Sequence, residues 1–527
     1  MTHLKKLQRS VTFAGSLLLA AFGAQAAGNF SIQNGTWIVT SEINGEPGRG
    51  MAIDVQDGTL VMQVYNYEKS GQPTFHLSFG TMDGNHYSGT LTRYKNGRYF
   101  GSGPLDGAED GQAGSVQIDF KSASTGTIQF PGEQPVAIER FNFDMIPPGT
   151  LSRPNVSERW LLAELDETDK PVNALLLNTT TTGFSPGPMN VPALSSAQSF
   201  KDGTASSTTC SYASATQRFK CDIQFDGTSG KRTLQWTKHL EGMSGTISGF
   251  SACMFSPCPP TTRRVVGMRL GLDSGAAAVD AQMDAPAANM APPFYHVAPD
   301  PGTWIVSSEL TGKPGRGMAI DVQYDTLVMQ VYNYEKSGAA TFHLAIAPYK
   351  DGQASSHLKR YEGGRYFGSG PLSGHEAVDA GAVSFNFTAP TRGTIQFPGE
   401  PAVAIQRYQF GATEPALESL YGGWMFFDPA KKILKYFDLD HIYNMTPPVA
   451  TGSGGQVLAS CRYTGEPAAS VLCEDKSPVI FHEMRFTPVN GRAIGNFTNQ
   501  RGATAGTPVY VLRVKDRNGN LAGLGKF

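Results

Sequence analysis

Two histidines, His76 and His343, stand at equivalent positions of a repeated four-residue segment, TFHL, in this 527-residue chain. An imidazole there has the chemistry of a general base, and it equally suits the solvated face of a strand. No Ser, Cys or carboxylate stands at a spacing that defines a catalytic partner for either ring. We therefore favour a solvated strand histidine, assign no catalytic residue, and keep both histidines as candidates for ligand binding.

Arginines recur in the same repeated segments. Arg49 and Arg316 each lie in the sequence PGRGMA, where glycines let the backbone turn tightly. A guanidinium in such a turn can hold a carboxylate or phosphate ligand, or it can pair with Glu42 or Glu309 on the preceding strand. The structural ion pair is the favoured interpretation. The same two alternatives apply to Arg98, Arg140, Arg365 and Arg407.

Tyrosines form a third recurring set. Tyr65 and Tyr67, like Tyr332 and Tyr334, lie on the face of a strand opposite to apolar residues that we expect to form a core. Exposed aromatic rings in a row stack against sugars, and they also pack one sheet against a neighbouring domain. We favour packing between an A domain and a B domain, as defined below. The set also includes Tyr94, Tyr99, Tyr361 and Tyr366.

The elements that position these residues are strands of a duplicated module. Residues 35–143 align with residues 302–410 without a gap, and about three in five positions are identical. Met51, Ile53 and Val55 follow a period of two, which is typical of a half-buried strand. Turn sequences such as KSG and KNG separate runs that predict seven or eight antiparallel strands. A meander of that length closes into a barrel or folds into two packed sheets.

Six cysteines in the segments that follow each copy are spaced as local pairs. The pairs are Cys210 with Cys221, Cys253 with Cys258, and Cys461 with Cys473. Each is spaced to link a hairpin or a short loop, so we expect three disulfides and an oxidising compartment. A metal site is not favoured, because no second Cys or His pair stands nearby.

The sequence thus predicts an all-β protein of tandem small antiparallel β-barrels or β-sandwiches in the order A-B-A-B. We expect a signal peptide at residues 1–26, domain A1 at 27–150, domain B1 at 151–273, an Ala/Pro-rich linker at 274–301, domain A2 at 302–412 and domain B2 at 413–527.

The composition indicates where the protein works and what it does not bind. Positive charge, an apolar stretch and the small residues of Ala24-Gln25-Ala26 predict export to the periplasm or the exterior. No later apolar run is long enough for a membrane-spanning helix. The formal net charge is −2 without a run of Lys and Arg, so nucleic acid is not an expected partner. No phosphate loop or dinucleotide fingerprint is present, and we expect no cofactor and no metal.

The motifs GTWIV, GRGMAIDVQ, VYNYEKSGQPTFHL and GTIQF of the first copy resemble an uncharacterised class of exported bacterial β-repeat domains. That class carries Gly-x-Trp, Gly-x-Gly and Tyr-x-Tyr, followed by a Gly-x-Pro turn and an aromatic pair. The second copy has GAATFHL in place of that turn, and the B segments match poorly. The resemblance implies no known chemistry. The opening Gly-x-Trp is also similar to the start of lipocalin and avidin barrels, in which the Trp plugs one end.

Two functions remain open. The first is a secreted or periplasmic non-enzymatic binding or surface protein, whose two A modules raise avidity for a glycan, a small apolar molecule or a partner protein. The second is an extracellular hydrolase with a site between A and B domains that uses His76 or His343. A purely structural part of an envelope or extracellular assembly is not separated from the first function by the sequence.

Overall fold

The structure is a computed structural model. It describes residues 30–56, 58–143, 157–181, 192–213, 218–227, 230–240, 242–249, 261–272, 299–323, 326–350, 352–389, 391–410, 417–428, 433–443, 449–453, 458–464, 471–476, 481–486, 491–499, 506–517 and 519–523. The predicted signal peptide, most of the predicted linker, and Cys253 with Cys258 lie outside these residues.

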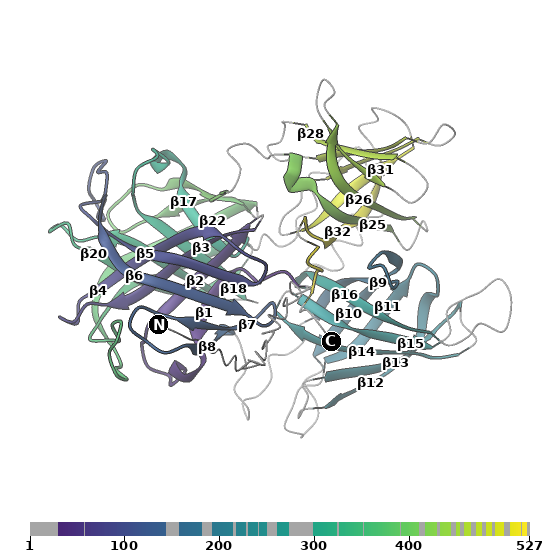
Figure 1. Cartoon of the computed structure of the whole chain (residues 1–527), viewed down its shortest axis with the longest axis horizontal. Coiled ribbons are helices and arrows are strands. Elements are labelled where there is room, and N and C mark those ends of the chain that lie inside the picture. The colour runs from purple at the N-terminus through teal and green to yellow at the C-terminus, as the bar shows by residue number, and fades with distance from the viewer. Residues whose placement is uncertain are drawn as a thin grey trace, which may run out of the picture.

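The strands form four closed antiparallel barrels of eight strands each, one after another along the chain (Figure 1). In each barrel the first strand pairs with the last, so the sheet closes on itself. The predicted all-β fold of tandem small domains is confirmed, and the barrel is the form adopted. Closure leaves no free sheet edge within a barrel.

The two A barrels share one strand order, with a short 3-10 helix after the first strand. Barrel A1 consists of β1 (Gly35–Val39), η1 (Thr40–Glu42), β2 (Gly50–Gln56), β3 (Thr59–Tyr67), β4 (Pro73–Thr81), β5 (His86–Lys95), β6 (Ala108–Phe120), β7 (Thr125–Gln129) and β8 (Val136–Arg140). Barrel A2 consists of β17 (Gly302–Val306), η3 (Ser307–Glu309), β18 (Gly317–Gln323), β19 (Thr326–Tyr334), β20 (Ala340–Lys350), β21 (Gln353–Glu362), β22 (His375–Ala389), β23 (Arg392–Gln396) and β24 (Val403–Arg407).

The two B barrels follow the same meander. Barrel B1 consists of β9 (Ser157–Leu165), β10 (Pro171–Thr181), β11 (Pro192–Ser199), β12 (Gly203–Ala213), β13 (Arg218–Phe225), β14 (Arg232–His239), β15 (Gly242–Gly249) and β16 (Thr261–Leu272). Barrel B2 consists of η4 (Leu417–Leu420), β25 (Gly422–Asp428), β26 (Ile433–Tyr443), β27 (Val449–Ser453), β28 (Leu458–Tyr463), β29 (Val471–Lys476), β30 (Phe481–Phe486), β31 (Arg492–Thr498) and β32 (Thr507–Lys515).

Large apolar side chains occupy the interior of barrel A1. The alternating positions of β2 and β3 place Ile53, Leu60 and Met62 in the core, where all three are fully buried. Trp37 on β1 packs edge-on against Phe120 with 5.5 Å between ring centroids. An eight-stranded barrel is just wide enough for side chains to fill it, so this interior is a packed core. The first strand of every barrel contributes a buried tryptophan, namely Trp37, Trp160, Trp304 and Trp424.

Two of the three predicted disulfides lie within the described residues, and both are confirmed. Cys210 and Cys221 are register partners on β12 and β13, with 4.1 Å between Cα atoms. Cys461 and Cys473 are register partners on β28 and β29, at the same Cα separation. Each therefore links neighbouring strands of one B barrel, in line with the predicted hairpin links and with an oxidising compartment.

The barrels associate in like pairs. A1 packs on A2, chiefly through β4 against β20 and through β1 and β2 against β18 and β17. B1 packs on B2 through β9, β10 and β16 against β25, β26 and β32. Figure 1 shows the A pair on the left, with B1 at the lower right and B2 above it. The Ser31 backbone N–H donates to the Leu521 carbonyl at 3.1 Å, so the segment before A1 meets the segment after B2.

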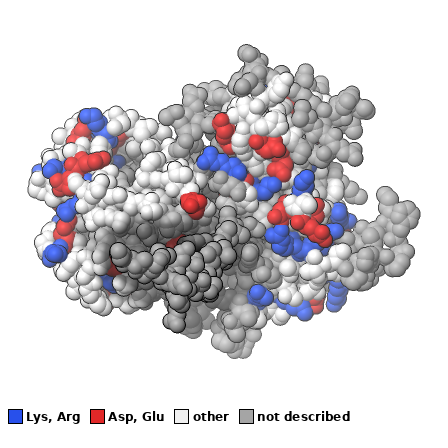
Figure 2. All heavy atoms as spheres, viewed as in Figure 1, with Lys and Arg blue, Asp and Glu red and all other residues white. Residues whose placement is uncertain are grey.

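No helix in the described part of the chain is long and apolar enough to cross a membrane. Acidic and basic side chains are interspersed over the face seen in Figure 2, on both the A pair and the B pair. The described residues on this face form no basic stripe of the kind with which proteins follow a phosphate backbone.

Candidate functional site

The predicted binding residues of the two A domains come together where A1 faces A2, a surface that we call the seam. Its apolar centre consists of Ala52, Tyr65, Tyr67, Phe75, Ala319, Tyr334 and Phe342, all buried. We expected these tyrosines to pack an A domain against a B domain, and that expectation is wrong. The domain that covers them is the other A copy, because β4 and β20 lie side by side across the seam.

Aromatic rings interlock across the seam. Phe342 of A2 lies 5.5 Å from Tyr65 and 5.8 Å from Tyr67, edge-on to both rings. Phe75 of A1 lies 4.9 Å from Tyr332. Burial raises the pKa of Tyr65 well above its ordinary value, so this phenol stays neutral. These contacts use the tyrosines as packing groups between barrels.

One loop of each A barrel reaches across the seam. We call residues 96–107, between β5 and β6, the A1 arm, and residues 363–374, between β21 and β22, the A2 arm. Phe367 of the A2 arm packs against the core of A1 and stacks on Phe130 at 5.5 Å. Phe100 of the A1 arm packs against the core of A2 and stacks on Phe397 at the same distance. Each arm therefore covers the core of the other barrel.

A glycine in each arm permits this approach. A Cβ atom at Gly97 would lie 2.0 Å from the ring of Tyr334, and a Cβ atom at Gly364 would lie 2.1 Å from the ring of Tyr67. Only glycine fits at either position. The repetition of GRYFGSGPL in both copies was the sequence signal for the arms, but nothing in it indicated which barrel they cover.

The predicted ion pair between Arg49 and Glu42 is present, at 3.0 Å, with Glu42 at the end of a 3-10 helix and not on a strand. Arg49 also makes two parallel hydrogen bonds to Glu133, at 2.7 and 2.8 Å. Arg365 of the A2 arm joins the cluster at 2.9 Å from Glu42. Burial acts to raise the pKa of Glu133, but hydrogen bonds from Arg49 and from the Gly368 backbone N–H outweigh it and lower the pKa. The carboxylate is therefore held ionised.

The second copy repeats this cluster with the roles of the two barrels exchanged. Arg316 pairs with Glu309 at 2.9 Å and with Glu400 at 2.7 Å. Arg98 of the A1 arm lies 3.1 Å from Glu309, and the Gly101 backbone N–H donates to Glu400 at 2.9 Å. All four arginines of the predicted binding set are thus engaged with carboxylates at the seam.

Two further ion pairs cross the seam in full burial. Arg407 donates to both carboxylate oxygens of Asp54, each at 2.6 Å. Arg140 is 2.6 Å from Asp321 in the equivalent pair. Each arginine and each aspartate recurs in both copies, but the partners belong to different copies. No spacing within one copy therefore indicated these pairs.

The two repeated histidines are also buried at the seam. His76 is 3% exposed, and its Nδ1 atom shares a 3.1 Å hydrogen bond with the Asn66 carbonyl oxygen. Its ring lies 5.1 Å from Phe367 of the A2 arm. The expected solvated histidine is therefore wrong. Burial, aided by the charge of Arg93, lowers the pKa of His76 to about 4.

His343 repeats this environment with Asn333 and Phe100, and burial lowers its pKa to about 4 as well. No hydroxyl or carboxylate of the described residues hydrogen-bonds either ring. A neutral imidazole bonded to an amide and covered by a phenyl ring supports packing between barrels.

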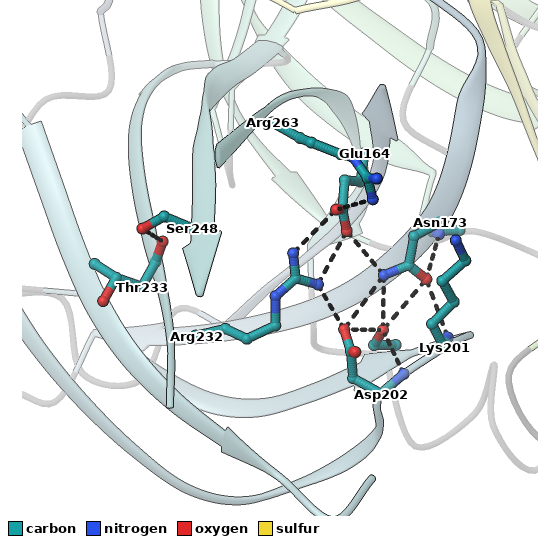
Figure 3. A network of polar contacts seen from close by, with 10 residues as sticks. Glu164, Asn173, Lys201, Asp202, Arg232, Thr233, Ser248 and Arg263 are labelled. Carbon is teal, nitrogen blue, oxygen red and sulfur yellow. Dashed lines mark hydrogen bonds and ion pairs between the residues drawn. The ribbon is translucent and has the colours of Figure 1, made fainter. Parts of the chain in front are cut away.

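A separate polar network lies inside barrel B1 (Figure 3). Glu164 continues the inward side of β9 beyond Trp160 and accepts two hydrogen bonds from Arg232, both at 3.0 Å. Arg232 also lies 2.6 Å from Asp202, and Asn173 donates to Glu164 at 2.9 Å. Glu164, Asp202, Asn173 and Arg232 are all fully buried.

The network reaches towards solvent at Arg263, whose side chain is 29% exposed and lies 3.3 Å from Glu164. No motif in the sequence indicates this network, because its members are spread over about a hundred residues. The signal that the sequence contained was a carboxylate at an inward strand position, four residues after a buried tryptophan.

Barrel B2 has a carboxylate in the same place. Asp428 follows Trp424 by four residues, as Glu164 follows Trp160, and it is buried. On β29, the strand that carries Cys473, Asp475 lies 3.2 Å from both Lys435 and His482. The two B barrels thus share a polar element in the core, although the residues that compose it differ.

No group of three or more His, Cys, Asp or Glu residues in the described part of the chain could hold a metal ion. No protein family model matches the chain, and no curated protein matches it. The arrangement of paired charges and packed rings therefore carries the functional argument.

Proposed function

We propose that the protein is an exported, non-enzymatic binding or surface protein, and that its interlocked A pair presents each outer surface of the A barrel twice. The observation that carries this proposal is the seam, across which each A barrel makes equivalent contacts to the other. It engages the candidate arginines, tyrosines and histidines in contacts between barrels. The surfaces that remain for a ligand are the outer faces, and there are two copies of each.

Exposed apolar side chains support this proposal. Six of the large apolar residues exposed in the described part of the chain form three equivalent pairs, Ile43 with Leu310, Phe79 with Ile346, and Leu105 with Leu372. Two of these pairs have changed residue type between the copies and stayed apolar. Phe79 also lies 6.3 Å from Phe410 of the other barrel, so the argument rests on the other two pairs. Water-exposed positions do not require apolar side chains, so the persistence of those pairs in both copies favours a surface that meets a partner.

The candidate ligands are not equally supported. A small apolar molecule needs a cavity, but large buried side chains pack the interior of each A barrel. A glycan or a partner protein that binds outside the barrels is therefore the better candidate. Two linked sites would raise avidity for a repetitive or multivalent partner.

The proposal is tested with the mature chain, residues 27–527, on arrays of extracellular glycans, lipid vesicles and envelope proteins. We expect binding to at least one class, and weaker apparent affinity when the ligand is presented at low density. A chain that binds nothing on any array would contradict the proposal. So would hydrolysis of a glycan, ester or peptide panel that disappears in a His76→Gln/His343→Gln variant.

A further inference from the structure

A groove of about 600 Å³ crosses β21, β22 and β23 on the outside of barrel A2. Its lining consists of residues 355–357, 381–384 and 396–399. The register between β21 and β22 shifts after Leu358, and Gly381 has a φ of +109° beside Pro398. Such bulges bend a sheet and redirect its side chains. The groove has the volume of an ordinary ligand site.

Neutral hydrogen-bonding groups form a row across this groove. Ser355 is the register partner of Ser384, and Ser384 is the register partner of Gln396. Register partners on one face place their side chains about 5 Å apart. All three residues are exposed, and no described residue hydrogen-bonds the hydroxyl of either serine. Gln396 donates its amide to the Glu400 carbonyl at 3.2 Å, which leaves its own carbonyl oxygen as an acceptor.

A histidine of fixed orientation stands next to this row. His357 Nδ1 lies 2.9 Å from a carboxylate oxygen of Asp379. Asp379 also accepts hydrogen bonds from Lys359 at 3.0 Å and from the Gly381 backbone N–H at 2.9 Å. These donors, Lys359 first, lower the pKa of Asp379. The ionised carboxylate therefore accepts a hydrogen bond from the Nδ1–H group of His357. The Nε2 atom makes none of these contacts and is left to hydrogen-bond a ligand hydroxyl.

We propose that this groove binds a short stretch of a neutral glycan, with the sugar hydroxyls bonded to Ser355, Ser384, Gln396 and His357 Nε2. The inference rests on the proposed binding function and names the ligand class of one outer face, that of A2. Each of these four side chains can donate to or accept from a hydroxyl, and His357 is the one ionisable side chain in the lining. The charged residues beside the groove are paired with one another, Lys359 with Glu376 at 2.8 Å and with Asp379.

A peptide fits the groove less well than a glycan. Extended peptides bind by adding a strand to a free sheet edge. The A2 barrel is closed, and at the gap in the β20–β21 register between Leu344 and Tyr349 the Ser356 hydroxyl already donates to the Ile346 carbonyl at 2.6 Å. The floor at Ala382 and Pro398 is small and apolar, which suits the C–H face of a sugar ring but offers no deep pocket for a peptide side chain.

Barrel A1 provides a matched control within the same chain. Its equivalent row is Ser88, Gln117 and Gln129, on the register of β5, β6 and β7. Thr90 stands where A2 has His357, and Gln112 stands where A2 has Asp379. The A1 face therefore keeps hydrogen-bonding groups but lacks the oriented imidazole.

The experiment titrates the mature chain with uncharged hexasaccharides of glucose and of N-acetylglucosamine by calorimetry. The variants are Ser355→Ala/Ser384→Ala/Gln396→Ala in A2 and Ser88→Ala/Gln117→Ala/Gln129→Ala in A1, with His357→Ala as a third. All substituted side chains are exposed or at the surface, so thermal unfolding should be unchanged. We expect the A2 triple variant and His357→Ala each to weaken binding at least tenfold, and the A1 variant to weaken it less than threefold.

Unchanged affinity in the A2 variants would overturn the inference, and so would an equal loss in the A1 variant. Binding of an acidic oligosaccharide or a peptide in place of the neutral sugars would also overturn it. If the arrays find a partner protein while no neutral sugar binds, the glycan site fails and the proposed binding function stands. If nothing binds anywhere, both fail.

Discussion

The A pair and the B pair both join two barrels of one kind, but they place their ionic groups differently. Between A1 and A2, arginines and carboxylates cross the seam, as in Arg407 with Asp54. Between B1 and B2 the contact is chiefly an apolar cluster that includes Leu161, Leu176 and Phe427, and the buried Arg159 of B1 donates to the Tyr510 hydroxyl of B2 at 3.1 Å. The buried carboxylates of B1 lie inside its own barrel, around Arg232. The ion pairs of the A pair therefore join two barrels, whereas the ion pairs around Arg232 lie in the interior of one barrel.

This difference gives a physical reason for the unequal similarity of the copies. A buried charge at the seam needs its own counter-charge from the other barrel, so a change in one A copy requires a matching change in the other. An apolar interface tolerates exchange of side chains of similar volume. The A copies are identical at about three in five positions, whereas the B copies are only faintly similar.

The largest expected effect on stability comes from removing a fully buried arginine of the B1 network, compared with removing a partly exposed one. Arg232→Met leaves Glu164 and Asp202 buried without their main counter-charge, and we expect a loss of about 3–5 kcal/mol of unfolding free energy. Denaturant unfolding with hydrogen-exchange mass spectrometry should place the loss in B1. Arg263→Met removes a partly exposed partner of the same carboxylate and should cost about 1 kcal/mol or less. Equal losses in the two variants would refute this account of the network.

The next effect is a loss of stability of the A pair at low pH. The pKa of His76 and of His343 is about 4 in the folded protein and 6.5 ordinarily, so the unfolded chain binds protons more readily. Stability from each ring is full above pH 6.5 and falls as the pH drops towards 4, by about 3 kcal/mol for each ring. We expect hydrogen exchange at β4 and β20 to accelerate over this window. In His76→Gln/His343→Gln the acceleration should be absent; an identical pH profile would show that other groups control it.

A smaller effect tests whether the B barrels are stabilised separately. Cys461→Ser/Cys473→Ser opens a short loop in B2, and we expect a loss of about 2–3 kcal/mol because the unfolded chain gains freedom. The loss should appear in the exchange of β28 and β29 and leave the A strands unchanged. Comparable loosening of the A pair would mean that the two pairs unfold as one unit.

The smallest expected effect tests whether each arm stabilises the core of the other barrel. Phe367→Ala removes a partly buried ring from the core of A1, and we expect a cost of about 2 kcal/mol, below the range for a fully buried ring. The faster exchange should appear in β7 of A1, although the substitution is in A2. Phe100→Ala should do the reverse, and Leu105→Ala, on an exposed residue of the A1 arm, should change stability by less than about 0.5 kcal/mol. Local loosening confined to the substituted copy would disprove the exchange of arms.

Alternation in the sequence predicted much of the fold. Met51, Ile53, Leu60 and Met62 predicted strands with one apolar face, and these side chains lie in the core of A1. The register of Cys461 with Cys473 also followed from spacing. Both patterns are local, because a strand and a hairpin are determined by residues close together in the chain.

The candidate site depended on contacts that are not local. The sequence placed Tyr65 and Tyr67 on an outward face, but it did not indicate that a second copy, 267 residues away, covers them. It paired Arg49 with Glu42 but missed Glu133, which is brought close only when the barrel closes. Barrel closure and pairing between repeats are properties of the folded chain, so no motif within one copy encodes them.

The exchange of arms has a consequence for the history of the gene. Recombination between two such similar repeats readily deletes one of them, and the surviving barrel would then have neither the phenyl ring over its core nor a counter-ion for its buried aspartate. Selection would remove such a deletion because the protein folds poorly, before any loss of ligand binding had an effect. The exchange of arms therefore favours keeping both copies, whether or not both still bind the same ligand.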